Sequence, residues 1–327
     1  MREEDIRPAD LFARYLELCR EDAYRYFHEA EREILPCPAC GCPESLPAFE
    51  KWGFHYVICK ACETLYQSPR PLRNYFERFY QESASALYWA DHFFPSVAEA
   101  RRIHLFRPKV MEVADLCAKD GFTPLSVADI GAGYGIFLEE WKRLHREAHV
   151  VAVEPNPVLA EVCRGKGFDV IESFLEDDFP LDPIDFVTAF EVIEHVHEPL
   201  LFLRRMRSLL RKGGKILLTG LTVDGFDIQI LWDKSKSISP PHHINFLSVK
   251  GVNFLLERAG FRQIRVFTPG KLDVDIVSNT YRVQPEILDN QRFVRLLLSR
   301  GTEVGQAFQR FLAEARLSSH CWIWAEK

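Results

Sequence analysis

Residues 127–140 read Val-Ala-Asp-Ile-Gly-Ala-Gly-Tyr-Gly-Ile-Phe-Leu-Glu-Glu, and Val-Val-Ala-Val-Glu follows at residues 150–154. The first apolar run predicts a buried strand, and the glycines predict a tight turn that a ligand can approach without a Cβ in the way. The helix that opens after this turn points its unpaired N–H groups at the same place. The second run predicts a neighbouring strand, at whose end the Glu154 carboxylate can hold ribose hydroxyls. The stretch therefore predicts a nucleoside-type cofactor site on a doubly wound sheet.

The spacing of the glycines decides which cofactor is expected. A dinucleotide fingerprint, Gly-x-Gly-x-x-Gly, would place its third glycine where Ile136 stands. Here Gly131, Gly133 and Gly135 follow Asp129 in a Gly-x-Gly-x-Gly pattern. This pattern resembles motif I of class I S-adenosylmethionine (SAM) methyltransferases, in which the acid helps to hold the cofactor's amino group. The alternative is another small-molecule Rossmann domain that has this spacing by accident.

Three further stretches resemble the same family, in the same order along the chain. Residues 154–156 resemble the ribose-binding end of the second strand, and residues 184–197 resemble the fourth strand with its exit loop. Residues 210–218 resemble the helix exit into the fifth strand. The resemblance implies a SAM-dependent methyltransferase. Outside the glycine turn, the cofactor-binding residues that it implies are Glu154, Pro155, Ser173, Phe174 and Glu191.

Four cysteines form two Cys-x-x-Cys pairs, Cys37/Cys40 and Cys59/Cys62, with eighteen residues between the pairs. This spacing is typical of a four-cysteine zinc ribbon. Four thiolates leave no open position for water, so such a zinc ion is structural and folds a segment too small to have its own core. Two disulfides would conflict with a cytosolic context, and a redox site would need only one pair.

Predicted strands and helices alternate from residue 125 to residue 219, which indicates a parallel sheet with right-handed crossovers. The resemblance implies a Rossmann-like seven-stranded α/β sheet whose antiparallel seventh strand lies at residues 320–327. A mainly helical insertion at about 270–318 precedes that strand. The expected organisation is an N-terminal helix at 1–35, a zinc ribbon at 36–70, a helical linker or lid at 71–120 and the SAM-binding methyltransferase domain at 121–327.

Two helical regions precede the predicted cofactor domain. Apolar side chains recur in steps of three and four between residues 8 and 34, which predicts one helix. Residues 71–120 are rich in aromatic side chains and contain basic ones such as Arg101 and Lys109. This segment either forms a lid that holds an anionic substrate through arginine contacts, or has its aromatics in the core and its arginines in solvent.

The composition is that of an ordinary globular protein, with 47% hydrophobic and 27% charged residues and a formal net charge of −6. The negative charge argues against a large phosphate-neutralising surface, so no nucleic-acid partner is expected. No stretch approaches the apolar length of a membrane span, and the first five residues do not resemble a signal peptide. We therefore expect a cytoplasmic enzyme with a small-molecule substrate and no membrane partner.

Two histidines are candidate catalytic bases. Methyl transfer from a sulfonium is an in-line displacement, so the protein must position the nucleophile and remove its proton if it carries one. Histidine suits this task near neutral pH. His195 follows the fourth strand and His243 follows the fifth, which places both at the carboxyl edge of the sheet, where open α/β sheets bind ligands. The alternative for His195 is that the Glu194-His195 dipeptide only shapes the site.

The layout of ribbon, SAM domain and C-terminal extension resembles bacterial sugar methyltransferases. His195 falls on a histidine used there, and residues 243–248 resemble their second histidine motif. The resemblance implies a nucleotide- or glycan-linked sugar as the acceptor. Those enzymes have an acid just before the second histidine and a tyrosine two residues before that acid, where this chain has His242 and Pro240. Methylation of a sugar oxygen is therefore at least as well supported as methylation of carbon.

Two other functions remain open at this point. The chain can be a methyltransferase of RNA or protein that docks its substrate through the zinc ribbon, although residues 36–66 carry two lysines and no arginine against three acids. It can also be a non-catalytic SAM- and zinc-binding interaction protein, but that function predicts a damaged cofactor motif.

Overall fold

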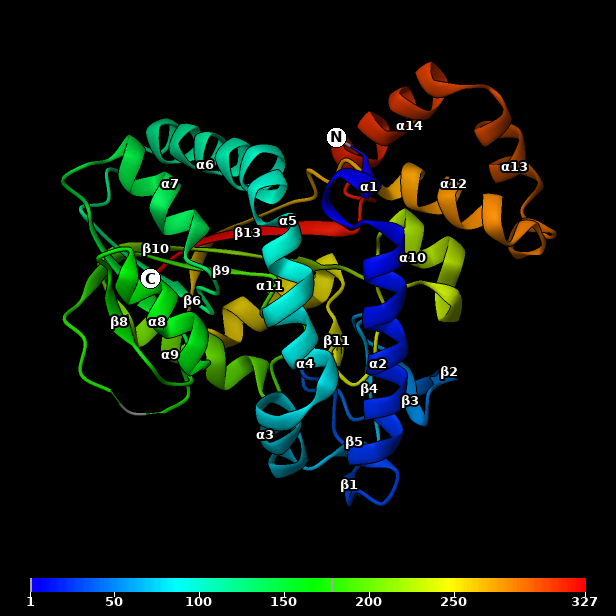
Figure 1. The fold of residues 1–327 in the computed structure, drawn as a ribbon, viewed down its shortest axis with the longest axis horizontal. Helices are drawn as coiled ribbons and strands as arrows, with labels where there is room; N and C mark the ends of the chain where they lie inside the picture. Colours follow the sequence, from blue (N-terminus) through cyan, green and yellow to red (C-terminus); the bar gives the residue numbers. More distant parts are fainter. Residues whose placement is uncertain (1, 178) are drawn as a thin grey trace.

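The computed structural model describes residues 2–177 and 179–327. At its centre is a seven-stranded sheet with the strand order β12-β13-β10-β9-β6-β7-β8 (Figure 1). All neighbouring strands are parallel except at β13, which is antiparallel to both β10 and β12. This topology confirms the predicted α/β sheet. Its strands are β6 Ser126–Ile130, β7 His149–Val153, β8 Asp169–Ile171, β9 Ile184–Phe190, β10 Leu210–Leu221, β12 Arg262–Phe267 and β13 His320–Glu326.

Helices cover both faces of this sheet because successive strand residues point to opposite faces. Phe186 of β9 packs in one apolar cluster with Trp141 of α7, whereas its neighbour Val187 packs in another with Met206 of α9. Figure 1 shows α6 and α7 on one side of the sheet and α9 and α11 on the other. The bounds are α6 Arg107–Lys119, α7 Ile136–Leu144, α8 Pro157–Gly165, α9 Pro199–Leu209 and α11 Val249–Ala259.

The N-terminal region contains a short helix, α1 (Glu3–Ile6), and a long one, α2 (Ala9–Phe27). The helix predicted over residues 8–34 therefore ends seven residues early, and Ile34 is 85% exposed. The reason is a short antiparallel pairing of β1 (Arg32–Glu33) with β5 (Arg70–Pro71), which requires extended backbone. Periodicity alone did not reveal this pairing with a distant segment.

The linker forms α3 (Arg73–Glu82), α4 (Ala84–Tyr88) and α5 (Phe94–Arg101) before α6 begins. Five-residue π-helical turns precede and follow α5. Phe79 and Phe93 are fully buried, which confirms the core alternative for these two aromatics. The same alternative placed the basic side chains in solvent, and this part is wrong for Arg101 and Lys109, which are half-buried.

The cysteine-rich segment forms a second, smaller sheet with the strand order β11-β4-β3-β2. Three strands come from the segment itself, but β11 comes from the loop that carries His243. Arg70 ties the two regions together, because its guanidinium donates to the His197 carbonyl at 2.7 Å and to Asn245 Oδ1 at 2.6 Å. The bounds are β2 Ser45–Lys51, β3 Phe54–Cys59, β4 Leu65–Gln67 and β11 Asn245–Phe246.

Residues 270–318 are mainly helical, as the sequence predicts, and pack against α10. Leu231 of α10 lies in one apolar cluster with Ile276 and Val277 of α12. Figure 1 shows these helices gathered at the end of the sheet at which β13 begins. The bounds are α10 Phe226–Leu231, α12 Asp273–Val283, α13 Arg292–Ser299 and α14 Thr302–Glu314.

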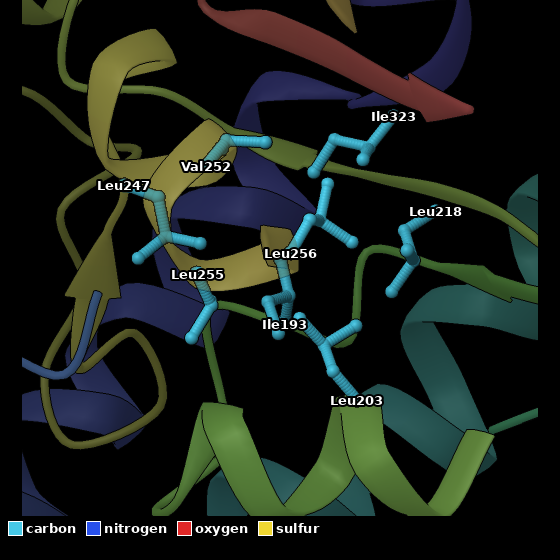
Figure 2. Close-up of a pocket in the computed structure, with 8 residues that line it drawn as sticks. All are labelled: Ile193, Leu203, Leu218, Leu247, Val252, Leu255, Leu256 and Ile323. Carbon is cyan, nitrogen blue, oxygen red and sulfur yellow. The ribbon is translucent and has the colours of Figure 1, made fainter. Parts of the chain in front are cut away.

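A cavity of about 10 Å³ lies in the core between α11, α9 and the sheet (Figure 2). Figure 2 shows apolar side chains around it, including Ile193, Leu218 and Leu256. A space of this size and lining has no room for a cofactor and no polar partner for a water. Within residues 2–177 and 179–327, no helix combines the length and the hydrophobicity needed to cross a bilayer.

Candidate active site at the carboxyl edge of the sheet

The turn between β6 and α7 adopts backbone that glycine tolerates best. The φ angles of Gly131 and Gly133 are 68° and 56°, in the left-handed region. A Cβ on Gly131 would come within 2.9 Å of Val192 Cγ2, whereas a Cβ on Gly133 would meet nothing within 4 Å. Gly135 has the same conformation and begins α7. Gly133 therefore faces open space, as a cofactor that approaches this turn requires.

Glu154 follows β7 and reaches across to the turn. Its carboxylate accepts hydrogen bonds from the Gly133 N–H at 2.7 Å and from the Asn156 N–H at 2.9 Å. Burial raises the pKa of this carboxyl, and the two N–H donors lower it in part. Pro155, the next residue, is half-buried. The predicted ribose-holding acid thus lies beside the open space at Gly133.

Asp129 lies one residue before the end of β6 and is 2% exposed. Its Oδ1 accepts a hydrogen bond from the Thr188 hydroxyl at 2.7 Å. Burial raises the pKa of Asp129 to about 7, against the opposing effects of Thr188 and Lys109. The acid is next to the glycine turn as expected, and its contact with the cofactor's amino group stays a prediction.

The remaining predicted cofactor residues lie at the ends of β8 and β9. Ser173 and Phe174 follow β8 and are half-buried, and the Ser173 hydroxyl donates to Asp177. Glu191 follows β9 with an unusual φ of 56° and accepts a hydrogen bond from the Thr219 hydroxyl at 2.6 Å. Non-glycine residues in this conformation are concentrated at functional sites. The structure brings all three to the edge that carries the glycine turn, and their roles stay predictions.

The site has the chemistry that SAM requires. Glu154 offers a carboxylate for ribose hydroxyls, and Gly133 leaves room for the adenosine to approach. Burial raises the pKa of Glu191, but His320, Lys109 and the Thr219 hydroxyl outweigh burial and hold that pKa well below its usual range. An ionised carboxylate at this end of the site would favour the positive charges of the sulfonium and the ammonium.

The structure brings the two predicted catalytic histidines together. The rings of His195 and His243 lie 4.7 Å apart, centroid to centroid. His243 Nδ1 is 2.5 Å from the Ser237 carbonyl oxygen, which can only accept, so Nδ1 carries the proton and Nε2 keeps its lone pair. His195 Nδ1 is 3.3 Å from the Tyr80 hydroxyl. Burial lowers the pKa of His195, and it lowers that of His243 to about 4, so both rings are neutral at neutral pH.

Glu194 completes a cluster with these histidines. It is 1% exposed, and its Oε2 has no hydrogen-bond partner in the described part of the chain. Potential metal-ligand atoms of Glu194, His195 and His243 all lie within 4.8 Å of one another. The charges of Arg7 and Lys51 act on His243 and would repel a cation, while the charge of Glu191 opposes them. Proton handling is therefore the better account of this cluster.

Two residues beside the site were missed at the sequence level. His320, the first residue of β13, places Nδ1 3.4 Å from Glu191 Oε1. Tyr80 of α3 contacts His195 through its hydroxyl. A signal for His320 was available, because the sequence predicted an antiparallel last strand from residue 320, and such a strand begins at the edge where its parallel neighbours end. The sequence carries no comparable signal for Tyr80.

The four predicted metal ligands converge. Cys37 Sγ lies 3.5 Å from Cys62 Sγ, and Cys40 Sγ lies 3.5 Å from Cys59 Sγ. Tetrahedral zinc with bonds of about 2.3 Å would separate its sulfurs by about 3.8 Å. The arrangement therefore suits a zinc ion after a slight expansion. Cys42 is outside this group, since its Sγ contacts the Glu44 carbonyl.

The chain is similar to curated proteins named tRNA U34 carboxymethyltransferase. The protein from Shewanella pealeana is 29% identical over 182 residues, and the one from Shewanella piezotolerans is 30% identical over 182 residues. Each match covers 53% of this chain and 53% of the relative. The chain thus spans about half the length of the curated relatives that it matches. These names do not support the sugar acceptor that the sequence resemblance implied.

Solved structures of other methyltransferases are also similar. Human N-acetylserotonin methyltransferase aligns with a TM-score of 0.49 at 15% identity and covers 79% of this chain and 60% of its own. A SAM-dependent methyltransferase from Archaeoglobus fulgidus aligns with a TM-score of 0.46 at 19% identity and covers 72% of this chain and 100% of its own. Identities of 15% and 19% do not indicate which acceptor this chain methylates.

Gly133→Ala should separate cofactor binding from folding. A Cβ there meets no protein atom but enters the space assigned to the cofactor, so the affinity for S-adenosylhomocysteine should fall about tenfold or more. The left-handed backbone should cost only about 1 kcal/mol of stability. Gly121→Ala is the matched control, because Gly121 has a φ of 60° and is equally open. Calorimetric titration and denaturant unfolding measure both quantities. Equal affinities of the two variants would contradict this cofactor position.

The family of the chain follows from its match to a protein-family model. A model of the methyltransferase domain family matches residues 98–266, which is just over half of the 327 residues. That range contains the glycine turn, Glu154, Glu191 and both candidate bases. The chain therefore belongs to the methyltransferase domain family and is a SAM-dependent methyltransferase-family enzyme.

Proposed function

We propose that this enzyme transfers a methyl group from SAM to a nucleophile held between Glu191 and the histidine pair. The observation that carries the proposal is the contact of the Gly133 N–H with the Glu154 carboxylate at the edge that also carries His195 and His243. SAM supplies the electrophilic methyl group when it is bound. Glu154 and the glycine turn bind its adenosine, and Glu191 faces its methionine end.

His243 is the better placed of the two bases. Its Nδ1 proton is fixed on the Ser237 carbonyl, so Nε2 is the atom that accepts the acceptor's proton. The ring of His195 lies 4.7 Å from that of His243, and its Nδ1 is within hydrogen-bonding distance of the Tyr80 hydroxyl. Burial, and after it the charge of Glu191, raises the pKa of the neighbouring Glu194 carboxyl well above its usual range, which favours the neutral form that can donate a hydrogen bond to the pair.

Two acceptor classes are supported by different observations. A nucleotide of RNA is supported by the relatives named for tRNA, and it is the first candidate. A nucleotide- or glycan-linked sugar is supported by the convergence of His195 and His243, the histidines through which the sequence resembles sugar methyltransferases. The ribbon packs against α11 through contacts such as Arg258 Nη1 to the Ala39 carbonyl.

A direct assay separates these acceptors. The protein is incubated with methyl-labelled SAM and either bulk bacterial tRNA or a panel of nucleotide sugars, and the products are analysed by mass spectrometry. We expect one methyl group on a nucleoside of the digested tRNA. Methylation of a sugar instead would replace the first candidate by the second. Absence of both products from protein that binds S-adenosylhomocysteine would contradict both acceptors.

His243→Gln should lower turnover about 100-fold or more, because it removes the proposed base, while the affinity for S-adenosylhomocysteine changes little. The pH dependence adds a second readout. Burial lowers the pKa of His243 to about 4, so its base form persists above that pH, and the acid limb of kcat should lie well below the usual histidine value. His55→Gln, at an exposed ribbon position, is the control. Unchanged turnover in His243→Gln would exclude this residue as the base.

We also infer that Cys37, Cys40, Cys59 and Cys62 hold one structural zinc ion. Purified protein should contain about one zinc per chain, and Cys59→Ser should lose it together with much of its thermal stability. Cys42→Ser is the matched control, because Cys42 lies outside the cluster and should keep the metal. Metal analysis and thermal unfolding measure both effects. Full stability in a zinc-free Cys59→Ser variant would contradict a structural role.

A further inference from the structure

Three cations lie beside the candidate active site without an acidic partner. Arg7 follows α1, Arg101 ends α5 and Lys109 lies in α6. α1 packs against α5, and the two helices lie side by side in Figure 1. Within residues 2–177 and 179–327, none of the three forms an ion pair. Arg102 differs, since it pairs with Glu139 and Glu140 at 2.9 Å each.

Each of these cations is partly removed from water. All three are half-buried, and the Nε atoms of Arg7 and Arg101 are buried without a hydrogen-bond partner in the described chain. Their charged groups lie over aromatic rings instead, Arg7 at 5.2 Å from Phe12 and Lys109 at 4.6 Å from Phe190. A cation over a ring keeps its other hydrogen-bond donors available. Burying such charges unpaired is costly, so a site of this kind is expected to receive an anion.

The pKa shifts of Arg101 and Lys109 also show that these cations lie close to one another and away from water. Burial lowers the pKa of Arg101 to about 10, and the charge of Arg7 lowers it further while Glu191 opposes both. Burial also lowers the pKa of Lys109, and Arg101 again contributes. These mutual effects mean that the cations are close enough to repel one another. Glu191 acts on both groups, and Asp129 and Glu112 also act on Lys109.

Two of the cations lie beside the candidate site. Lys109 Nζ is 4.6 Å from the ring of Phe190, the residue before Glu191. Arg101 lies over Phe94, whose ring stacks on Tyr134 of the glycine turn. The charge of Arg7 acts on His243, the proposed base, and also on His320 and Glu191. The charge of Lys109 acts on Glu191 and His320 as well. An anionic group held by the cations would therefore lie on the side of the site that carries Glu191.

We propose that Arg7, Arg101 and Lys109 form a subsite for a phosphate group of the methyl acceptor. The proposal rests on the proposed function and narrows its substrate class to phosphorylated molecules, which include RNA nucleotides and nucleotide-linked sugars but not glycan-linked ones. Guanidinium groups present paired N–H donors that match phosphate oxygens, and the lysine adds a third positive charge. The cations thereby orient the acceptor, and they take no part in the bond changes.

The main competitor for these cations is the carboxylate of the cofactor's own methionine group. Two ligands distinguish the sources. S-adenosylhomocysteine carries that carboxylate, whereas methylthioadenosine lacks it. If the cations bind the cofactor, Arg101→Gln weakens S-adenosylhomocysteine about tenfold and leaves methylthioadenosine unchanged. If they bind the acceptor, both ligands bind Arg101→Gln as they bind the wild type.

The decisive experiment titrates inorganic pyrophosphate into protein saturated with S-adenosylhomocysteine and follows binding by calorimetry. We expect wild-type protein to bind pyrophosphate and Arg7→Gln and Arg101→Gln to bind it about tenfold more weakly or worse. Arg107→Gln is the control, because Arg107 also lies in α6 but is half-exposed and paired with Glu140 at 3.1 Å. It should bind pyrophosphate like the wild type.

Two outcomes would overturn the subsite. One is pyrophosphate affinity in Arg7→Gln and Arg101→Gln equal to that of wild type, and the other is loss of S-adenosylhomocysteine affinity in Arg101→Gln with retention of methylthioadenosine. Failure of wild-type protein to bind S-adenosylhomocysteine would instead contradict the proposed function. Circular dichroism of each variant confirms that the fold is kept, and Lys109→Gln provides an independent variant if either arginine variant unfolds.

Discussion

The hydrogen bond from the Gly133 N–H to the Glu154 carboxylate is the interaction on which the site depends. It joins the turn after β6 to the end of β7. The Glu154 carboxylate is therefore held at a fixed position relative to the open space at Gly133. Every other element of the site, from Glu191 to the histidine pair, is arranged along the same edge of the sheet.

The ribbon that carries the four cysteines is also part of the active-site wall. Its strand β4 pairs with β11, and the hydroxyl of Tyr56 donates to the His243 carbonyl at 2.7 Å. Arg70 adds bonds to the chain beside His195 and His243. A zinc ion that orders the ribbon would therefore also order the loop that carries the proposed base.

Local patterns predicted the parts of the molecule that local chemistry determines. The glycine spacing, the Cys-x-x-Cys pairs and the alternation of strands and helices indicated the sheet and the four-cysteine cluster, and the position of two histidines after parallel strands placed both at one edge of the sheet. Contacts between distant segments were not accessible. Examples are β11 in the small sheet, the β1–β5 pairing that ends α2 early, and the approach of Arg7 and His320 to Glu191, which long-range packing brings about.

The central claim is that SAM lies over the glycine turn between Glu154 and Glu191. The most direct measurement is a crystal structure of the protein with S-adenosylhomocysteine. The account predicts adenosine density beside Gly133, ribose hydroxyls on the Glu154 carboxylate and the sulfur directed toward the histidine pair. A ligand bound elsewhere, or a turn that stays closed to the ligand at saturating concentration, would contradict it.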